Sequence, residues 1–291
     1  MLAEWTNTIV QGVLLGGLYA LFATGLSLVF GIMRMVNIAH GDFIVLGAYV
    51  ALVAGYALGL GPFTALVVVV PAMALLGYVL QRGVINRTLG SDMLAPLQLT
   101  FGLSILLQNG LLEIFSADSK RLHAGTLEVA SIPLPGGVAV GEYPLIIFLV
   151  AVCVLASLQL FFTRTSLGRA FRATSDDETI AALMGVEGRH IYGLAMALAL
   201  AVAAVAGVMI AVRTSFAPSD GPARLLYAFE SVIIGGMGSL WGTLAGGIVL
   251  GVAQSIGSEL DPGWGILAGH LAFLSILAFR PKGLFPKTRD R

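Results

Sequence analysis

A few polar side chains interrupt the long apolar stretches of this sequence, and they are the residues best placed to bind or guide a solute. Asn37, His40 and Asp42 stand together in GIMRMVNIAHGDFIVLGAYVA. Polar groups in a membrane-like environment are costly, so they usually face a wet cavity or the inside of a helix bundle. The alternative is that they begin a helix, with Asn37 or Asp42 as the N-cap, while Gly41 and Gly47 let another backbone approach.

Glu230 raises the same question in the Gly-rich segment 225–258. An ionised carboxylate in lipid is expensive, and Gly-interrupted helices mark binding sites in many transporters. Glu230 therefore either lines a pathway or pairs with another helix. Gln98, Thr100, Gln108 and Asn109 recur in the fourth apolar run, 94–115. They suit hydrogen bonds between helices, or, for Gln98 and Thr100, a place near a pore. The candidate pathway residues are thus Asn37, His40, Gln98, Thr100, Asn109 and Glu230.

Enzyme chemistry is not indicated by these residues. The sequence has no nucleophile elbow, no HExxH zinc motif and no phosphate-binding GxxxxGK[ST] loop. A metal site would need His40, Asp42 and His270 to converge from distant elements without any ligand spacing. We therefore expect no catalysis, no metal and no cofactor. If the protein drives transport, the energy must come from another polypeptide.

The composition predicts an integral membrane protein. Of 291 residues, 57% are hydrophobic and 11% are charged, and the formal net charge of zero suggests no nucleic-acid partner. A helix crosses the bilayer with about 20 apolar residues. The runs 63–80 and 194–212 are apolar on every side, unlike the alternating strands of a barrel. Cys153 lies within an apolar run, where a small buried residue is expected.

The elements that carry the polar residues are predicted to be membrane helices of a single domain, 1–291. The segment 225–258 would be about 50 Å long as one helix, too long for a hydrocarbon core of about 30 Å. Gly235, Gly236 and Gly238 offer a break. We expect an all-α bundle of about eight to nine membrane helices, including a short or broken one. The apolar runs are 7–33, 36–58, 62–81, 94–115, 143–163, 191–212, 225–258 and 262–279.

Close packing is predicted where small residues recur. Glycines four residues apart let helix backbones approach each other. The candidate packing glycines are Gly41, Gly47, Gly235, Gly236, Gly238 and Gly242.

Basic residues predict the orientation, because short loops rich in Lys and Arg stay in the cytoplasm. Most of them fall on one side if the N-terminus is periplasmic and the C-terminus cytoplasmic. The loop 116–142 is then external and ordered by its prolines and glycines. The loop 164–190 is cytoplasmic. Its acidic residues 176–178 precede an Ala-rich stretch, which predicts a short helix ending near Gly185.

Five motifs in order resemble one family, the LivH-type permease subunits of branched-chain (hydrophobic) amino-acid ABC importers. The resemblance covers essentially the whole chain. The motifs are GGLYALFATGLSLVFGIMRMVNIAHGDFIVLGAYV, LTFGLSILLQN, TRTSLGRAFRATSDDETIAALMGVEGRHIY, ESVIIGGMGSLWGTLAGGIVLG and RPKGLFP.

The resemblance implies a location, partners and a docking site. The protein would lie in the bacterial inner membrane beside a LivM-type permease, above two cytoplasmic ATPases and below a periplasmic binding protein. A short cytoplasmic coupling helix would dock on the ATPase, and 116–142 would receive the binding protein. The implied coupling residues are Arg169, Ala170, Arg172, Asp176, Ala181, Ala182, Met184 and Gly185.

Two kinds of alternative stay open at the level of sequence. Within the same family, urea, short amides or aromatic acids could replace branched-chain amino acids as the solute. Outside it, the chain could be a secondary carrier or a channel. A secondary carrier is expected to place several ionisable groups deep in its helices, whereas Glu230 is nearly alone here.

Overall fold

The chain folds as a bundle of α-helices, as the apolar runs predict. The computed structural model describes residues 2–89, 94–134 and 137–285. Its helices are α1 (Leu2–Met33), α2 (His40–Leu58), α3 (Pro62–Gly83), α4 (Leu94–Phe115), α5 (Glu142–Arg164), α6 (Ser166–Asp176), α7 (Glu178–Leu183), α8 (Gly188–Arg213), α9 (Gly221–Gly235), α10 (Leu240–Leu260) and α11 (Gly265–Phe279). Short 3-10 turns are η1 (Ile85–Arg87), η2 (Gly125–Glu128) and η3 (Pro218–Asp220), and the strands are β1 (Ser131–Leu134) and β2 (Val138–Gly141).

Within the described ranges, seven helices are long and apolar enough to cross a membrane: α1, α2, α3, α4, α5, α8 and α10. The protein is thus a multi-pass membrane protein. The helices α9 and α11 have 15 residues each. At 1.5 Å per residue each is about 22 Å long, shorter than a hydrocarbon core of about 30 Å. With α11 as a shorter apolar helix, the described residues hold eight apolar helices, in line with the expected eight to nine, and α9 is a further short helix.

The predicted break within 225–258 is confirmed. The first helix, α9, ends at Gly235 and α10 begins at Leu240. Gly236 and Gly238 have φ angles of 102° and 79°, which glycine adopts without the steric cost of a side chain. Ser239 then caps α10 by accepting a hydrogen bond from the Gly242 amide at 3.1 Å.

Residues after α11 cover the open end of α9. The Leu284 amide donates to the Ile234 carbonyl, and the Phe285 amide donates to the Gly235 carbonyl, both at 2.9 Å. The last carbonyls of a helix have no partner within the helix. This terminal cap supplies two of them with backbone donors from a distant part of the chain.

The centre of the bundle is built from α1 and α8. In their most apolar windows, 83% of α1 and 78% of α8 are buried, against 17% of α4. The helices α3, α4 and α5 therefore lie at the periphery, where their surfaces would meet lipid or another subunit. Cys153 is exposed on α5, so the expectation that it is buried in the chain is wrong. An apolar residue needs no burial within its own chain when lipid surrounds the helix.

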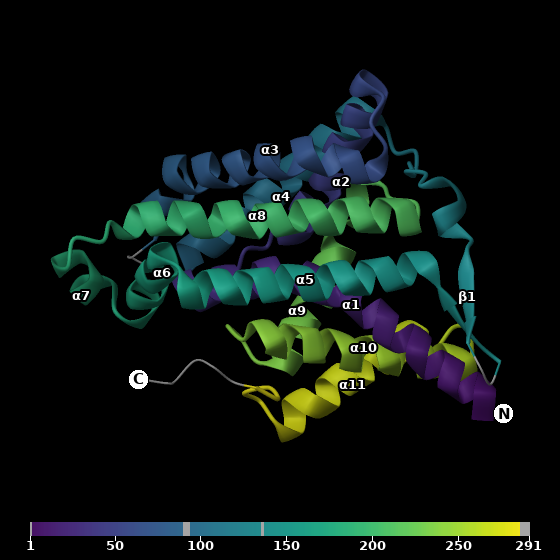
Figure 1. Cartoon of the computed structure of the whole chain (residues 1–291). Helices are drawn as coiled ribbons and strands as arrows, with labels where there is room; N and C mark the ends of the chain where they lie inside the picture. Colours follow the sequence, from purple (N-terminus) through teal and green to yellow (C-terminus); the bar gives the residue numbers. More distant parts are fainter. Residues whose placement is uncertain (1, 90–93, 135–136, 286–291) are drawn as a thin grey trace.

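The two ends of the bundle differ (Figure 1). The start of α1 and the β1–β2 hairpin lie at one end, while α6 and α7 project at the opposite end. The hairpin pairs Ser131 with Gly141 and Ile132 with Val140 in an antiparallel register. The order expected of 116–142 is present, although its strands were not predicted. Gln11 in α1 holds the hairpin by donating to the Ala139 carbonyl at 2.8 Å.

Candidate functional site

A small apolar tip protrudes from the α6–α7 end of the bundle. Ile180, Leu183 and Met184 are 60%, 82% and 81% exposed. The helix α7 begins where Asp177 accepts a hydrogen bond from the Ile180 amide at 3.0 Å, and it ends before Gly185, whose φ is 83°. These ends match the short helix predicted from the acidic residues and Gly185. The preceding helix α6, which starts at the Thr165 cap, was not predicted.

Polar contacts on several sides fix α6 and α7 to the membrane helices. Ser175 donates to the Gly31 carbonyl at the end of α1 at 2.6 Å. The Tyr192 hydroxyl in α8 donates to Glu178 at 2.9 Å. Arg172 donates to the Phe162 carbonyl in α5. These hydrogen bonds join the tip to α1, α5 and α8.

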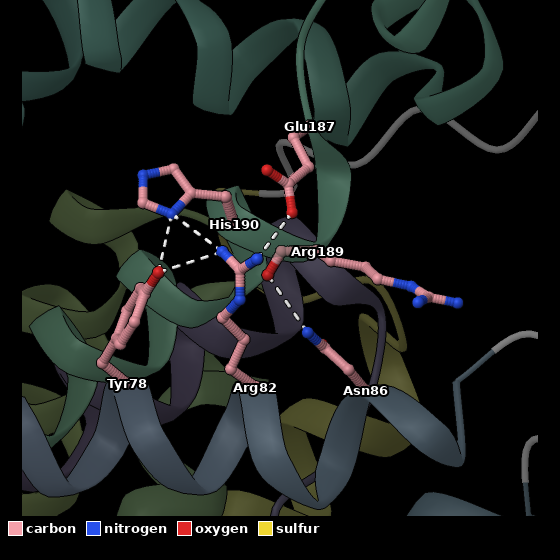
Figure 2. A network of polar contacts seen from close by, with 6 residues as sticks. All are labelled: Tyr78, Arg82, Asn86, Glu187, Arg189 and His190. Carbon is pink, nitrogen blue, oxygen red and sulfur yellow. Dashed lines mark hydrogen bonds and ion pairs between the residues drawn. The ribbon is translucent and has the colours of Figure 1, made fainter.

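A polar clamp ties the start of α8 to the end of α3, and Figure 2 shows its members pointing toward one another. We define it as Tyr78, Arg82, Asn86, Glu187 and His190 together with the Arg189 carbonyl. Arg82 pairs with Glu187 at 2.9 Å and donates to the Tyr78 hydroxyl at 3.1 Å. The Tyr78 hydroxyl lies 2.8 Å from His190 Nδ1. Asn86 donates to the Arg189 carbonyl at 3.1 Å.

Sequence reasoning missed this clamp, although a signal was present. Tyr78 and Arg82 are four residues apart, which places them on one face at the end of α3, and Asn86 follows four residues later on η1. Their partners are Glu187, just before α8, and Arg189 and His190 in its first turn, so the clamp joins the start of α8 to the end of α3.

The residues expected to contact an ATPase do not all face outward. Ala181 is 3% exposed and packs toward the bundle, so its side chain is not available to a docked partner. Arg172 is exposed but already donates to the Phe162 carbonyl. Of the other residues expected to contact the ATPase, Ala170 is half-buried. The exposed ones are Arg169, Asp176, Ala182, Met184 and Gly185.

Three of the candidate pathway residues meet around the start of α2. The Thr100 hydroxyl accepts a hydrogen bond from the Ile38 amide at 3.2 Å, and Asn37 accepts from the Ala39 amide at 3.0 Å. His40 Nε2 lies 2.9 Å from the Phe22 carbonyl. Asn37, His40 and Thr100 have no exposed surface. All three lie inside the bundle, although His40 Nδ1 has no hydrogen-bond partner among the described residues. Ala39 rather than Asn37 or Asp42 occupies the N-cap position.

Gln98 and Asn109 lie elsewhere, on the exposed face of α4. Gln98, Gly102, Asn109 and Glu113 are all exposed at helical spacing, and together we call them the α4 stripe. An added Cβ at Gly102 would meet nothing within 4 Å. Polar side chains are costly against lipid, and small residues admit a neighbouring helix. The α4 stripe therefore suits contact with another subunit or with a solute path between subunits.

Glu230 is 1% exposed and does not lie with the other candidates. Its Oε1 lies 2.5 Å from Nδ1 of His270 in α11. Glu230 Oε2 has no hydrogen-bond partner among the described residues. This geometry matches the second of the two interpretations of Glu230, a carboxylate paired with another helix.

Backbones approach closely at several of the candidate packing glycines. An added Cβ would lie 1.9 Å from the Gly221 carbonyl oxygen at Gly41 and 2.9 Å from Ala204 Cα at Gly47. The same atom would lie 2.0 Å from the Gly242 carbonyl oxygen at Gly235. Gly242 faces the Gly235 oxygen at 2.4 Å in return. Gly236 and Gly238 instead make the turn between α9 and α10.

Two cavities open near the α6–α7 end of the bundle. One, of about 200 Å³, lies between α1, α5 and α6. The other, of about 570 Å³, lies beside the α6–α7 junction. Across the described ranges there is no group of three His, Cys, Asp or Glu side chains able to hold a metal ion.

Comparison with known proteins finds relatives over nearly the whole length. The model of the family described as "Branched-chain amino acid transport system / permease component" matches residues 8–276. The permease protein BraD of the high-affinity branched-chain amino acid transport system of Pseudomonas aeruginosa is 33% identical, over 97% of this chain and 95% of that protein. LivH of Escherichia coli, named for the same kind of system, is 28% identical over 94% of this chain and 93% of LivH.

A paralogous type and a solved structure extend the comparison. LivM of Escherichia coli is 26% identical over 94% of this chain and 69% of LivM. The structure of "PsaBC from Streptococcus pneumoniae in complex with Fab" matches with a TM-score of 0.50 at 16% identity, over 97% of both chains. That likeness concerns the fold alone.

Proposed function

Because this chain belongs to the family of branched-chain amino acid transport permeases, we propose that it forms half of the translocation pathway of an ATP-driven importer for branched-chain amino acids. The observation that carries the proposal is the family match over residues 8–276. BraD and LivH, which align along nearly their full lengths, are named for the high-affinity transport of these solutes. As a permease component, the chain itself performs no catalysis.

Its partners follow from the same premise. We infer a second permease subunit of the LivM type, two cytoplasmic ATPases and a periplasmic binding protein, in the bacterial inner membrane. The α4 stripe supports a paired arrangement, because Gln98, Asn109 and Glu113 are exposed along a membrane helix. Facing a second subunit removes these groups from lipid, and a zwitterionic solute passing between the subunits would find hydrogen-bonding partners there.

The apolar tip is the proposed contact with the ATPase. Leu183 and Met184 are more than 80% exposed on a short helix whose ends are fixed by Asp177 and Gly185. Side chains of this kind fit a pocket on a partner protein. The polar contacts with α1, α5 and α8, together with the clamp to α3, would pass a rigid-body movement of the ATPases into the bundle. The transport mechanism is thus alternating access driven from outside this chain.

The test is ATP-dependent uptake by the complete importer in proteoliposomes, with labelled leucine and binding protein outside and ATP inside. Leu183→Asp and Met184→Asp are expected to reduce uptake by at least about tenfold, because each buries a charge in the contact with the ATPase. Phe279→Asp is the matched control, since Phe279 is 87% exposed at the end of α11, outside the α6–α7 unit. Unchanged uptake in both variants would contradict the coupling assignment.

The same vesicles separate the alternatives. Uptake that needs only a proton or sodium gradient, without ATPases, would show a secondary carrier. ATP-dependent uptake of urea, short amides or aromatic acids, without uptake of leucine, would show an importer of the same family that carries a different solute. Retention of leucine, isoleucine or valine by the associated binding protein is the expected result.

A further inference from the structure

The cavity of about 570 Å³ at the inner end of the bundle has a distinct chemistry. Its walls come from the end of α1, from η1, from the α6–α7 junction and from the start of α8. We propose that it binds a zwitterion, a molecule with both an ammonium and an anionic group, and that an α-amino acid in the cytoplasm is its occupant. The regulatory consequence drawn below rests on the proposed function.

Two arginines supply the positive side of the cavity. Arg34 follows α1 and Arg189 begins α8, and both line the cavity. Neither forms a salt bridge with a residue in the described part of the chain. Guanidinium groups bind carboxylates and phosphates through paired N–H donors. Two unpaired guanidinium groups at one cavity therefore provide an anion-binding side.

Both arginines are positioned by their backbones. The Arg34 backbone has a φ of 52°, a conformation uncommon for a residue with a side chain, and its amide donates to the Phe30 carbonyl at 2.9 Å. The Arg189 carbonyl accepts a hydrogen bond from Asn86 at 3.1 Å. Figure 2 shows that the Arg189 side chain extends away from the clamp residues. The clamp thus fixes one wall of the cavity without using the Arg189 charge.

Three acidic residues on the α6–α7 junction supply the negative side. Asp177 caps α7 and Glu178 accepts from Tyr192. Asp176 lines the same cavity and makes no salt bridge with a described residue. Next to it, Ser175 is anchored to the Gly31 carbonyl at 2.6 Å. Asp176 is therefore the group best placed to receive an ammonium.

This balance of charges selects the class of ligand. An anion alone, such as a nucleotide, would be repelled by the acidic residues of α6 and α7. A cation alone would face the two arginines. A zwitterion satisfies both sides at once, and each contact with a charged group is a strong hydrogen bond. The cavity volume of about 570 Å³ accommodates an amino acid together with water.

Occupancy would restrain the part of the protein that moves. The acidic wall belongs to the α6–α7 unit, which carries the proposed ATPase contact, whereas the basic wall belongs to α1 and α8. The Ser175–Gly31 and Tyr192–Glu178 hydrogen bonds already join the unit to α1 and α8, and a ligand bridging the walls would further favour the conformation in which the cavity has this shape. Accumulated amino acid in the cytoplasm would therefore slow further uptake.

The test uses the complete importer in proteoliposomes with ATP and graded unlabelled leucine inside, and labelled leucine with binding protein outside. Internal leucine is expected to lower the initial uptake rate. Arg34→Asn, which suits a positive φ, and Arg189→Gln should each raise the half-inhibitory concentration about tenfold, the effect of losing one hydrogen bond to a charged group. Arg87→Gln is the control, because Arg87 lies on η1 but does not line the cavity.

The outcomes are distinguishable. Uptake into vesicles without internal leucine tests the proposed function by itself. If that uptake is normal but internal leucine has no effect, or inhibits both arginine variants as strongly as the control, the site is overturned. Vesicles of phosphatidylglycerol alone contain no lipid ammonium group. Inhibition retained there supports a free amino acid, while inhibition that follows the content of phosphatidylethanolamine instead of leucine assigns the cavity to a lipid headgroup and overturns the proposal.

Discussion

The pair formed by Glu230 and His270 shows how a charge is kept inside a membrane bundle. Glu230 is 1% exposed, and one of its oxygens lies 2.5 Å from His270 Nδ1. Removing one member of a buried polar pair costs more than the pair contributes, because the remaining group keeps its desolvation penalty. The two helices α9 and α11 are joined at this point, so the cost is measurable as stability of the whole chain.

We predict that His270→Ala lowers the apparent melting temperature in detergent by roughly 2–10 °C, since an unsatisfied buried group costs about 1–3 kcal/mol. The double variant Glu230→Ala with His270→Ala should recover part of the loss, because neither polar group then remains buried. His123→Ala is the control, as the His123 side chain is 77% exposed. If His270→Ala left the melting temperature unchanged but abolished uptake, Glu230 would instead be assigned to the translocation pathway.

At the residue scale, the sequence identified most polar groups but not their neighbours. Asn37, His40 and Thr100 were predicted as pathway residues, and the structure brings them together because the loop before α2 packs against α4. Gln98 is two positions from Thr100, yet it points outward because helical residues two apart do not share a face. Which face of such a helix is buried depends on tertiary packing. The sequence of a uniformly apolar helix does not reveal it, because apolar residues occur on every face.

Among the elements, α2 and α9 approach each other closely at Gly41. An added Cβ there would lie 1.9 Å from the Gly221 carbonyl oxygen, and a backbone atom cannot move aside as a flexible side chain can. The close approach also brings Asp42 next to Gly221. The start of α2, with His40 and its neighbours, is therefore positioned by contact with the start of α9.

We predict that Gly41→Ala destabilises the protein by about 1–3 kcal/mol, the usual cost of overpacking, and lowers the yield of monodisperse protein in detergent. Gly83→Ala is the matched control, because an added Cβ at Gly83, the last residue of α3, meets nothing within 4 Å. That control should be neutral or slightly stabilising. Equal melting temperatures for the two variants would show that α2 and α9 do not pack as described.

The bounds of the long helices were predictable, whereas the inner elements were only partly so. The run 94–115 coincides with α4, and the Gly-rich break separates α9 from α10. The acidic residues 176–178 predicted α7, but no sequence signal was used to predict α6 before it. The buried face of α6 is formed by Gly168, Phe171 and Thr174. Such a short face between charged residues is a weaker signal than a membrane run.

For the whole molecule, the two ends of the bundle imply opposite sides of the membrane. The β1–β2 hairpin marks one end, and the α6–α7 unit with its basic neighbours marks the other (Figure 1). We infer from the distribution of Lys and Arg that the α6–α7 end is cytoplasmic and the N-terminus periplasmic.

We predict the labelling pattern of single cysteines in a Cys153→Ser background, which has no other cysteine. A membrane-impermeant maleimide should label Asp118→Cys in intact spheroplasts, and Met184→Cys only after the membrane is opened. Both positions are solvent-exposed, so access depends on the side of the membrane alone. The reverse pattern would invert the orientation and contradict the assignment of the ATPase contact.

The terminal cap on α9 has a consequence for how the protein is made. The amides of Leu284 and Phe285 reach the carbonyls of Ile234 and Gly235. During synthesis these donors emerge well after α9 has left the ribosome. The hydrogen bonds to the last carbonyls of α9 therefore cannot form until residues 284 and 285 have been made. The capping of α9 is thus completed late, and a fusion partner attached too near residue 285 would interfere with this step.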